Sequence, residues 1–164
     1  MLLSEIIKVL DDWCPASDAE DFDNVGLLVG DQESEIKKAI ITLDITDDVI
    51  DECVSCDSNL IISFHPLFII DPKTEIIDKR VNDLIIKCVN NDINVYCIHT
   101  NLDNNKDGTS YQLGKILKLK NQKILISNNG NSLTGMGSIG FMEKSMMDYD
   151  FISFLKEKFD LKCL

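Results

Sequence analysis

Two kinds of hydrophobic pattern alternate along the first hundred residues. One repeats apolar side chains every three or four positions, as in an amphipathic helix, and the other is a short continuous apolar run, as in a buried strand. Helical repeats lie near residues 2–13, 47–56 and 81–89. Continuous runs lie at residues 25–30, 39–44, 60–64 and 93–98. Pro15 ends the first helical repeat, and Thr46 is a suitable N-cap for the second.

This alternation predicts an α/β fold. Continuous apolar strands separated by amphipathic helices are typical of a mixed, largely parallel sheet with helices on both faces. Right-handed crossovers place the carboxyl ends of such strands at one edge of the sheet, where open α/β sheets bind their ligands. Asp44, His65 and His99 each lie at or just past the end of a predicted strand. We therefore expect these three polar side chains to meet at that edge.

A second part of the chain follows the predicted sheet. A helix near residues 108–119 and a strand at residues 124–127 continue the α/β pattern. After a turn, a glycine-rich strand-like stretch and a helix at residues 151–159 look like the opening of another unit, and residues 161–164 look like the start of a strand. We expect an α/β domain at residues 1–128, which carries the candidate site, and an incomplete second unit at residues 129–164 of a truncated chain.

Charge and composition narrow the possible partners. The 164 residues carry a net charge of −12 and a pI near 4.4, which disfavours nucleic acid and anionic membrane surfaces as partners. No apolar run approaches the roughly 20 residues that span a bilayer, and the first residues lack the basic start of a secretory signal. The six cysteines lack zinc-ribbon spacing and are expected to be thiols. These features predict a cytoplasmic protein.

His65, His99 and Asp103 are the candidate metal ligands. Imidazole nitrogen and carboxylate oxygen bind zinc, iron, manganese or nickel, and a catalytic zinc site uses three protein ligands and one open position. The alternative is that each histidine caps a strand end or binds a turn, while Asp103 is one of 28 acidic residues. A plain nucleotide-binding domain is a weaker alternative, because no phosphate-binding glycine loop is present.

Three segments together resemble a known family. Residues 23–30 (D-N-V-G-L-L-V-G), residues 63–67 (S-F-H-P-L) and residues 99–103 (H-T-N-L-D) are similar to motifs of the Nif-three-like dinuclear metal-centre family, often labelled as type-two GTP cyclohydrolase I homologues. The resemblance implies an α/β subunit of a ring-shaped homohexamer, with His65, His99 and Asp103 as ligands of a two-metal site. It also implies metal-dependent hydrolysis of a small-molecule substrate, which the sequence does not identify.

The chain departs from the family pattern at two places. Phe64 stands where the family has the first histidine of a pair, and the family's further histidine and glutamate come from a carboxyl-terminal segment beyond residue 164. We therefore expect at most one tightly bound metal per chain. The alternative function is a non-enzymatic or degenerate metal-binding scaffold, also oligomeric.

Overall fold

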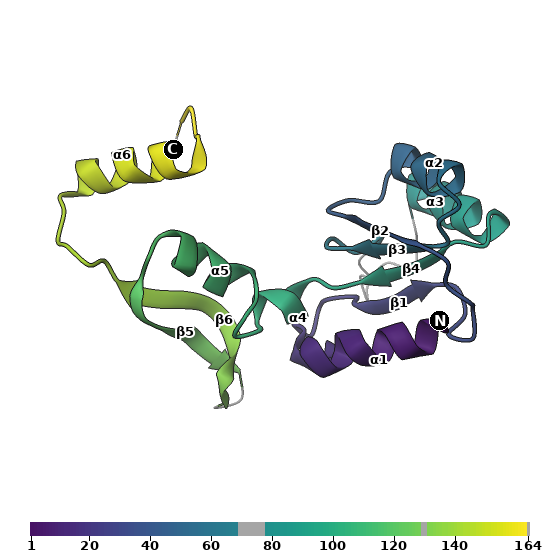
Figure 1. Ribbon diagram of the computed structural model, residues 1–164, viewed down its shortest axis with the longest axis horizontal. Coiled ribbons are helices and arrows are strands. Elements are labelled where there is room, and N and C mark those ends of the chain that lie inside the picture. Colours follow the sequence, from purple (N-terminus) through teal and green to yellow (C-terminus); the bar gives the residue numbers. More distant parts are fainter. Residues whose placement is uncertain (69–77, 129–130, 164) are drawn as a thin grey trace. The chain divides into compact units, whose positions relative to one another are not determined.

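The fold is seen in a computed structural model that describes residues 1–68, 78–128 and 131–163. The contacts between Cα atoms divide the chain into two units, Met1–Asn105 and Lys106–Leu164 (Figure 1).

The first unit is a mixed four-stranded sheet with helices. Its elements in chain order are α1 (Leu3–Trp13), the 3-10 helix η1 (Ala16–Asp18), β1 (Gly26–Val29), β2 (Ala39–Thr42), α2 (Asp47–Ser55), β3 (Leu60–Ser63), α3 (Lys79–Asn90), β4 (Asn94–Cys97) and α4 (Thr100–Asp103). The strand order is β1-β4-β3-β2. Strands β2, β3 and β4 run parallel, and β1 pairs antiparallel with β4. The predicted mixed, largely parallel sheet is confirmed.

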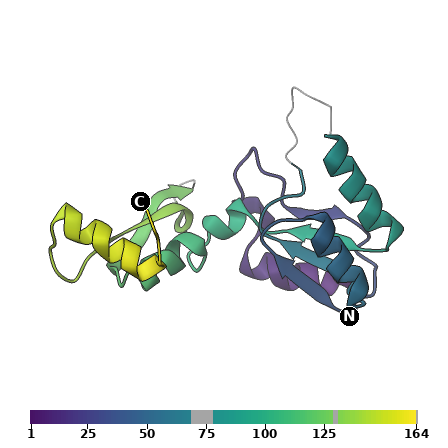
Figure 2. The same ribbon diagram turned by 90° about the horizontal axis from the view of Figure 1, so that it is seen from above.

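Helices cover both faces of this sheet. Figure 1 shows α1 below it and α2 and α3 above it, and Figure 2 looks down from the α2 and α3 side with α1 behind. Side chains alternate along β3 accordingly: Leu60 and Ile62 pack with the α1 layer, and Ile61 packs with the α2 and α3 layer. The strands are largely apolar because each face of the sheet has its own core.

Local capping explains where α2 and α3 begin. The Thr46 hydroxyl accepts a hydrogen bond from the Val49 N–H at 3.3 Å, which confirms the predicted N-cap of α2. The Asp78 carboxylate does the same for α3, accepting from the Arg80 N–H at 2.7 Å. The parallel strands end one or two residues earlier than their apolar runs, so the last residues of these runs lie in the loops at the sheet edge.

The register of the parallel strands defines that edge. Thr42 pairs with Ser63, and Ser63 pairs with Cys97, so these three residues form one row across the sheet. Asp44, His65 and His99 each come two residues after a member of this row. The three polar side chains therefore leave the sheet at the same level.

The second unit is a helix, a β-hairpin and a further helix. Its elements are α5 (Thr109–Ile116), β5 (Lys120–Asn128), β6 (Asn131–Phe141) and α6 (Asp148–Phe159). Strands β5 and β6 pair antiparallel over most of their length, and the Gln122 side chain donates to the Tyr111 carbonyl of α5 at 2.9 Å. Because β5 pairs with β6, it belongs to the second unit. The first unit ends at Asn105. The sequence pattern instead predicted a boundary at residue 128.

The end of the described chain also differs from its prediction. Residues 161–163 form no strand, and the last residue, 164, lies outside the described residues. Asp160 adopts a left-handed conformation, with φ 52°, and the Leu161 N–H donates to the Lys156 carbonyl at 2.9 Å. These residues therefore form the C-terminal cap of α6. Among the described ranges, no helix has the length and apolar character that a membrane crossing requires.

Candidate functional site

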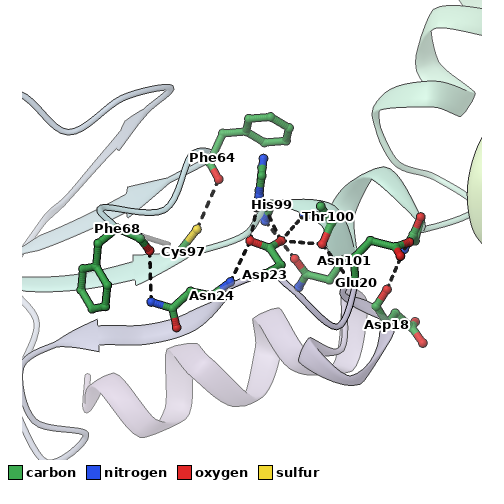
Figure 3. Close-up of polar contacts among 11 residues, drawn as sticks. Asp18, Glu20, Asp23, Asn24, Phe64, Phe68, Cys97, His99, Thr100 and Asn101 are labelled. Carbon is green, nitrogen blue, oxygen red and sulfur yellow. Dashed lines mark hydrogen bonds and ion pairs between the residues drawn. The ribbon is translucent and has the colours of Figure 1, made fainter. Parts of the chain in front are cut away.

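His99 and Thr100 are bound to one buried carboxylate, that of Asp23 (Figure 3). The His99 Nδ1 atom lies 3.0 Å from each of the two Asp23 oxygens. The Thr100 N–H donates to Oδ2 at 3.0 Å, the Thr100 hydroxyl donates to the same oxygen, and the Asn24 N–H donates to Oδ1 at 2.8 Å. The segments 23–30 and 99–103 are therefore joined through Asp23.

The surroundings of Asp23 stabilise its charged form. Burial by itself raises the pKa of this carboxyl, but the hydrogen bonds from His99, Thr100 and Asn24 outweigh burial and hold the pKa below its ordinary value. The Asp23 side chain is 0% exposed, and that of His99 is 18% exposed. Asp23 is therefore a carboxylate that accepts hydrogen bonds and has no access to solvent.

His65 makes a similar contact in a more open place. Its Nδ1 atom lies 2.7 Å from Oδ1 of Asp44, and the two side chains are 45% and 60% exposed. The centroids of the His65 and His99 rings are 5.6 Å apart, with the ring planes at 84°. The predicted meeting of Asp44, His65 and His99 at the carboxyl edge of the sheet is confirmed.

Phe64 lies against both histidines. Its ring centroid is 5.2 Å from that of His65 and 5.2 Å from that of His99. Its backbone carbonyl accepts from the Cys97 thiol at 3.3 Å, which ties the loop after β3 to the end of β4. Burial raises the pKa of that thiol to about 12, so Cys97 stays protonated and acts as a structural donor. Beside the two imidazole rings, the Phe64 ring contributes apolar surface and no metal-binding atom.

Three asparagines hold the loop after β4 in place. The side-chain amide of Asn101 donates to the Cys14 carbonyl, that of Asn104 to the Asp18 carbonyl, and that of Asn105 to the Trp13 carbonyl, at 2.9, 2.9 and 2.7 Å. The Asn101 side-chain oxygen also accepts from the His99 N–H at 2.9 Å. These bonds attach α4 to the end of α1 and to η1, and they fix the backbone that carries His99.

Asp103 is placed differently from the two histidines. It is the last residue of α4. Burial, together with the negative charges of Asp18, Asp11 and Asp103, raises the pKa of the Cys14 thiol to about 12. Within residues 1–68, 78–128 and 131–163, no three His, Cys, Asp or Glu side chains form a group that could hold a metal ion. The structure brings His65 and His99 together and does not gather Asp103 with them, so the role of Asp103 as a ligand stays a prediction.

The donor chemistry of the two histidines fits a divalent metal. A metal-binding histidine usually donates its other ring N–H to a carboxylate, which orients the ring and leaves the second nitrogen for the metal. His65 and His99 each have Nδ1 on a carboxylate, so Nε2 is the nitrogen that would bind. The sequence pattern placed Asp44 at this edge and Asp23 in a recognised segment, but it gave neither of them a histidine partner. The partners lie 21 and 76 residues apart in the chain, and no local spacing indicates such a contact.

Relatives of the chain are found among bacterial proteins. Residues 1–164 match the family model described as Duf34/NIF3 (NGG1p interacting factor 3). The GTP cyclohydrolase 1 type 2 homolog of Clostridium acetobutylicum is 37% identical over 163 residues, which cover 99% of this chain and 61% of that protein. The homolog of Clostridium perfringens is 36% identical over 164 residues, which cover 100% of this chain and 63% of that protein.

A solved structure is also similar. The crystal structure of the Staphylococcus aureus hypothetical protein SA1388 matches with a TM-score of 0.81 and 29% identity, covering 98% of this chain and 65% of that one. This chain thus spans 61% and 63% of the length of the two clostridial relatives.

Proposed function

The chain belongs to the Duf34/NIF3 family, and we propose that it is a divalent-metal-binding protein whose metal is held by His65 and His99. The observation that carries this proposal is the pair of imidazole rings 5.6 Å apart, each with its Nδ1 atom on a carboxylate. Imidazole suits zinc, iron and nickel, and nearby carboxylates extend the range to manganese. Asp103 is the third ligand in this proposal, as the sequence predicts.

The proposed activity is metal-dependent hydrolysis of a small molecule. A bound divalent metal supplies Lewis acidity and lowers the pKa of a water molecule. The chain's own residues orient the two imidazoles through Asp23 and Asp44, and Phe64 covers part of both rings. The clostridial relatives are called GTP cyclohydrolase 1 type 2 homologs, which supports a hydrolase and leaves its substrate open.

A non-enzymatic metal-binding scaffold is the second candidate function. The observation that favours it is Phe64, a ring without ligand atoms in contact with both histidines. Turnover assays with phosphoester or cyclic-amide substrates and added manganese, zinc or iron distinguish the two candidates. Turnover that is lost in His99→Ala supports the hydrolase, whereas saturable metal uptake without turnover supports the scaffold.

Titration calorimetry with zinc or manganese tests the ligand set. We expect His99→Ala to remove tight binding and Asp103→Asn to weaken it at least tenfold, which is about 1.4 kcal/mol. Asp107→Asn is the matched control, because it removes a nearby acid and should change the affinity little. Equal effects of the two aspartate substitutions would show that Asp103 acts only through its surface charge. Circular dichroism checks that each variant is folded.

Assembly into a homo-oligomer is also part of the proposal. The hairpin of the second unit exposes apolar side chains, including the cross-strand partners Ile126 and Met136, which are 61% and 49% exposed. Sedimentation of the parent should give a species larger than a monomer, and Ile126→Lys should reduce it. Ile41→Lys, at a position of β2 that is 82% exposed, is the control.

The six unpaired cysteines support a reducing compartment such as the cytoplasm as the location.

A further inference from the structure

Both oxygens of the Asp23 carboxylate are occupied by donors that cannot become acceptors. The Asn24 N–H donates to Oδ1 at 2.8 Å, and the Thr100 N–H donates to Oδ2 at 3.0 Å. These are backbone groups, which can only donate. The Thr100 hydroxyl accepts from the Glu20 N–H at 2.9 Å, and its own hydrogen is directed to Oδ2 of Asp23. Asp23 therefore presents only acceptor atoms to its surroundings.

This arrangement determines which nitrogen of His99 carries hydrogen. The Nδ1 atom lies 3.0 Å from both carboxylate oxygens, so it must donate, and the lone pair of the neutral ring is then on Nε2. We propose that Asp23 is a positioning residue that holds His99 in the Nδ1–H tautomer and so directs the Nε2 lone pair toward a metal. The link to the metal rests on the proposed function, whereas the tautomer does not.

The two histidines should differ in how strongly their tautomers are fixed. Asp23 is 0% exposed and is held by four donors, so water cannot take its place beside His99. Asp44 is 60% exposed and His65 is 45% exposed, so water can replace Asp44 as the hydrogen-bond partner of His65. Asp44→Asn is therefore a matched control for Asp23→Asn: it makes the same chemical change at the partner of the neighbouring histidine.

An amide at position 23 cannot satisfy the same donors. Whichever way the new side chain of the Asp23→Asn variant is turned, its NH₂ group faces either the Asn24 N–H or the Thr100 N–H. The NH₂ group also lies within reach of His99 Nδ1, where it favours a ring nitrogen that accepts. We expect Asp23→Asn to shift His99 toward the Nε2–H tautomer, which removes the lone pair from the metal-binding position. Loss of such an outer partner typically lowers metal affinity about 10–100-fold.

The test is nitrogen-15 NMR of the histidine rings in the metal-free full chain, at a pH above about 7.5 where free imidazole is mostly neutral. Long-range proton–nitrogen correlations identify which ring nitrogen is protonated. The parent should show His99 as the Nδ1–H tautomer, and Asp23→Asn should shift it. Zinc titration of the same samples should then show binding at least about tenfold weaker for Asp23→Asn, with a smaller change for Asp44→Asn.

Each outcome bears on the proposal. A parent with His99 as the Nε2–H tautomer overturns it, and this measurement requires no variant to fold. An Asp23→Asn protein that keeps both the Nδ1–H tautomer and the parent's zinc affinity also overturns it. Thr100→Val retains the carboxylate and removes one donor, so an altered His99 tautomer there would mean that the hydroxyl, and not Asp23, controls the ring. A parent that binds no zinc contradicts the proposed function, while the NMR measurement still decides whether Asp23 sets the tautomer.

Discussion

Asp23 and Asp44 are the same residue type beside the same kind of partner, yet burial makes their roles different. The first carboxylate is fully buried and accepts hydrogen bonds from two segments of the loops around it, whereas the second is largely exposed. A hydrogen bond to a buried charged group contributes more to stability than one at the surface, because water cannot replace the missing partner. Asp23 therefore contributes to the stability of the fold as well as to the geometry of the site.

Asp23→Asn should destabilise the protein in a pH-dependent way. The folded-state pKa of Asp23 is below its ordinary value of 3.8, so its contribution is fully present above that pH and is lost as the pH falls through the folded pKa. We expect a cost of about 2 kcal/mol in the free energy of unfolding at neutral pH and a smaller cost near pH 3. Urea denaturation of parent and variant at both pH values measures this. A cost that does not change with pH would contradict it.

We expect Phe64 to be the residue that most directly limits metal binding at this edge. Because its ring contacts both His65 and His99, an imidazole at the same place would add ligand atoms beside the existing pair. Phe64→His should raise the metal content per chain after identical loading, and Phe64→Leu, which stays apolar, should not. Elemental analysis together with titration decides this. Unchanged stoichiometry and affinity in Phe64→His would mean that ligands other than the one at position 64 limit the second metal.

At the scale of elements, one buried side chain at the start of β4 connects the loop after β1 with the residue before β3. Asn94 is 3% exposed. Its Oδ1 accepts from the Asp31 N–H and the Ser34 hydroxyl at 3.0 and 3.2 Å, and its Nδ2 donates to the Asn59 carbonyl at 3.0 Å. This network fills the space beside Gly30, so a side chain there has no room.

Gly30→Ala should therefore cost more stability than Gly26→Ala. Both glycines have positive φ, 114° and 93°, so alanine is strained at either position. At Gly30 the added Cβ would also lie 2.0 Å from Oδ1 of Asn94, whereas at Gly26 it would meet nothing within 4 Å. We expect about 1–2 kcal/mol for Gly26→Ala and clearly more for Gly30→Ala, by chemical denaturation. Equal costs would mean that backbone strain alone matters and that Asn94 can move aside.

At the scale of the whole molecule, the two units differ in how much they bury. Among the described residues, every buried apolar side chain lies between Leu3 and Ile98, in the first unit. The second unit is a two-stranded hairpin with helices, and such a hairpin is only marginally stable unless another layer covers it. The stability of the described chain is therefore concentrated in the first unit.

Hydrogen exchange should reveal this difference directly. Amides of β3 and β4, at the centre of the first sheet, should exchange slowly, and amides of β5, β6 and α6 should exchange much faster, because local opening there exposes little buried surface. Mass spectrometry of peptides after timed labelling measures both in one sample. Equal protection of the two units in a sample shown to be monomeric would contradict the expectation. Increased protection of the hairpin at high protein concentration would instead support association through that surface.

Local pattern alone determined the main helices and strands of the first unit and the edge of the sheet at which His65 and His99 meet. It could do so because the period of apolar residues specifies which face of an element is buried, and parallel strands all end at one edge. Only the tertiary structure decided that β5 belongs to the second unit with β6 and that Asp23 is the partner of His99. Asp23 and His99 lie 76 residues apart in the chain, and such a contact leaves no periodic trace in the sequence. The apolar run of β5 does not by itself specify the strand with which it pairs.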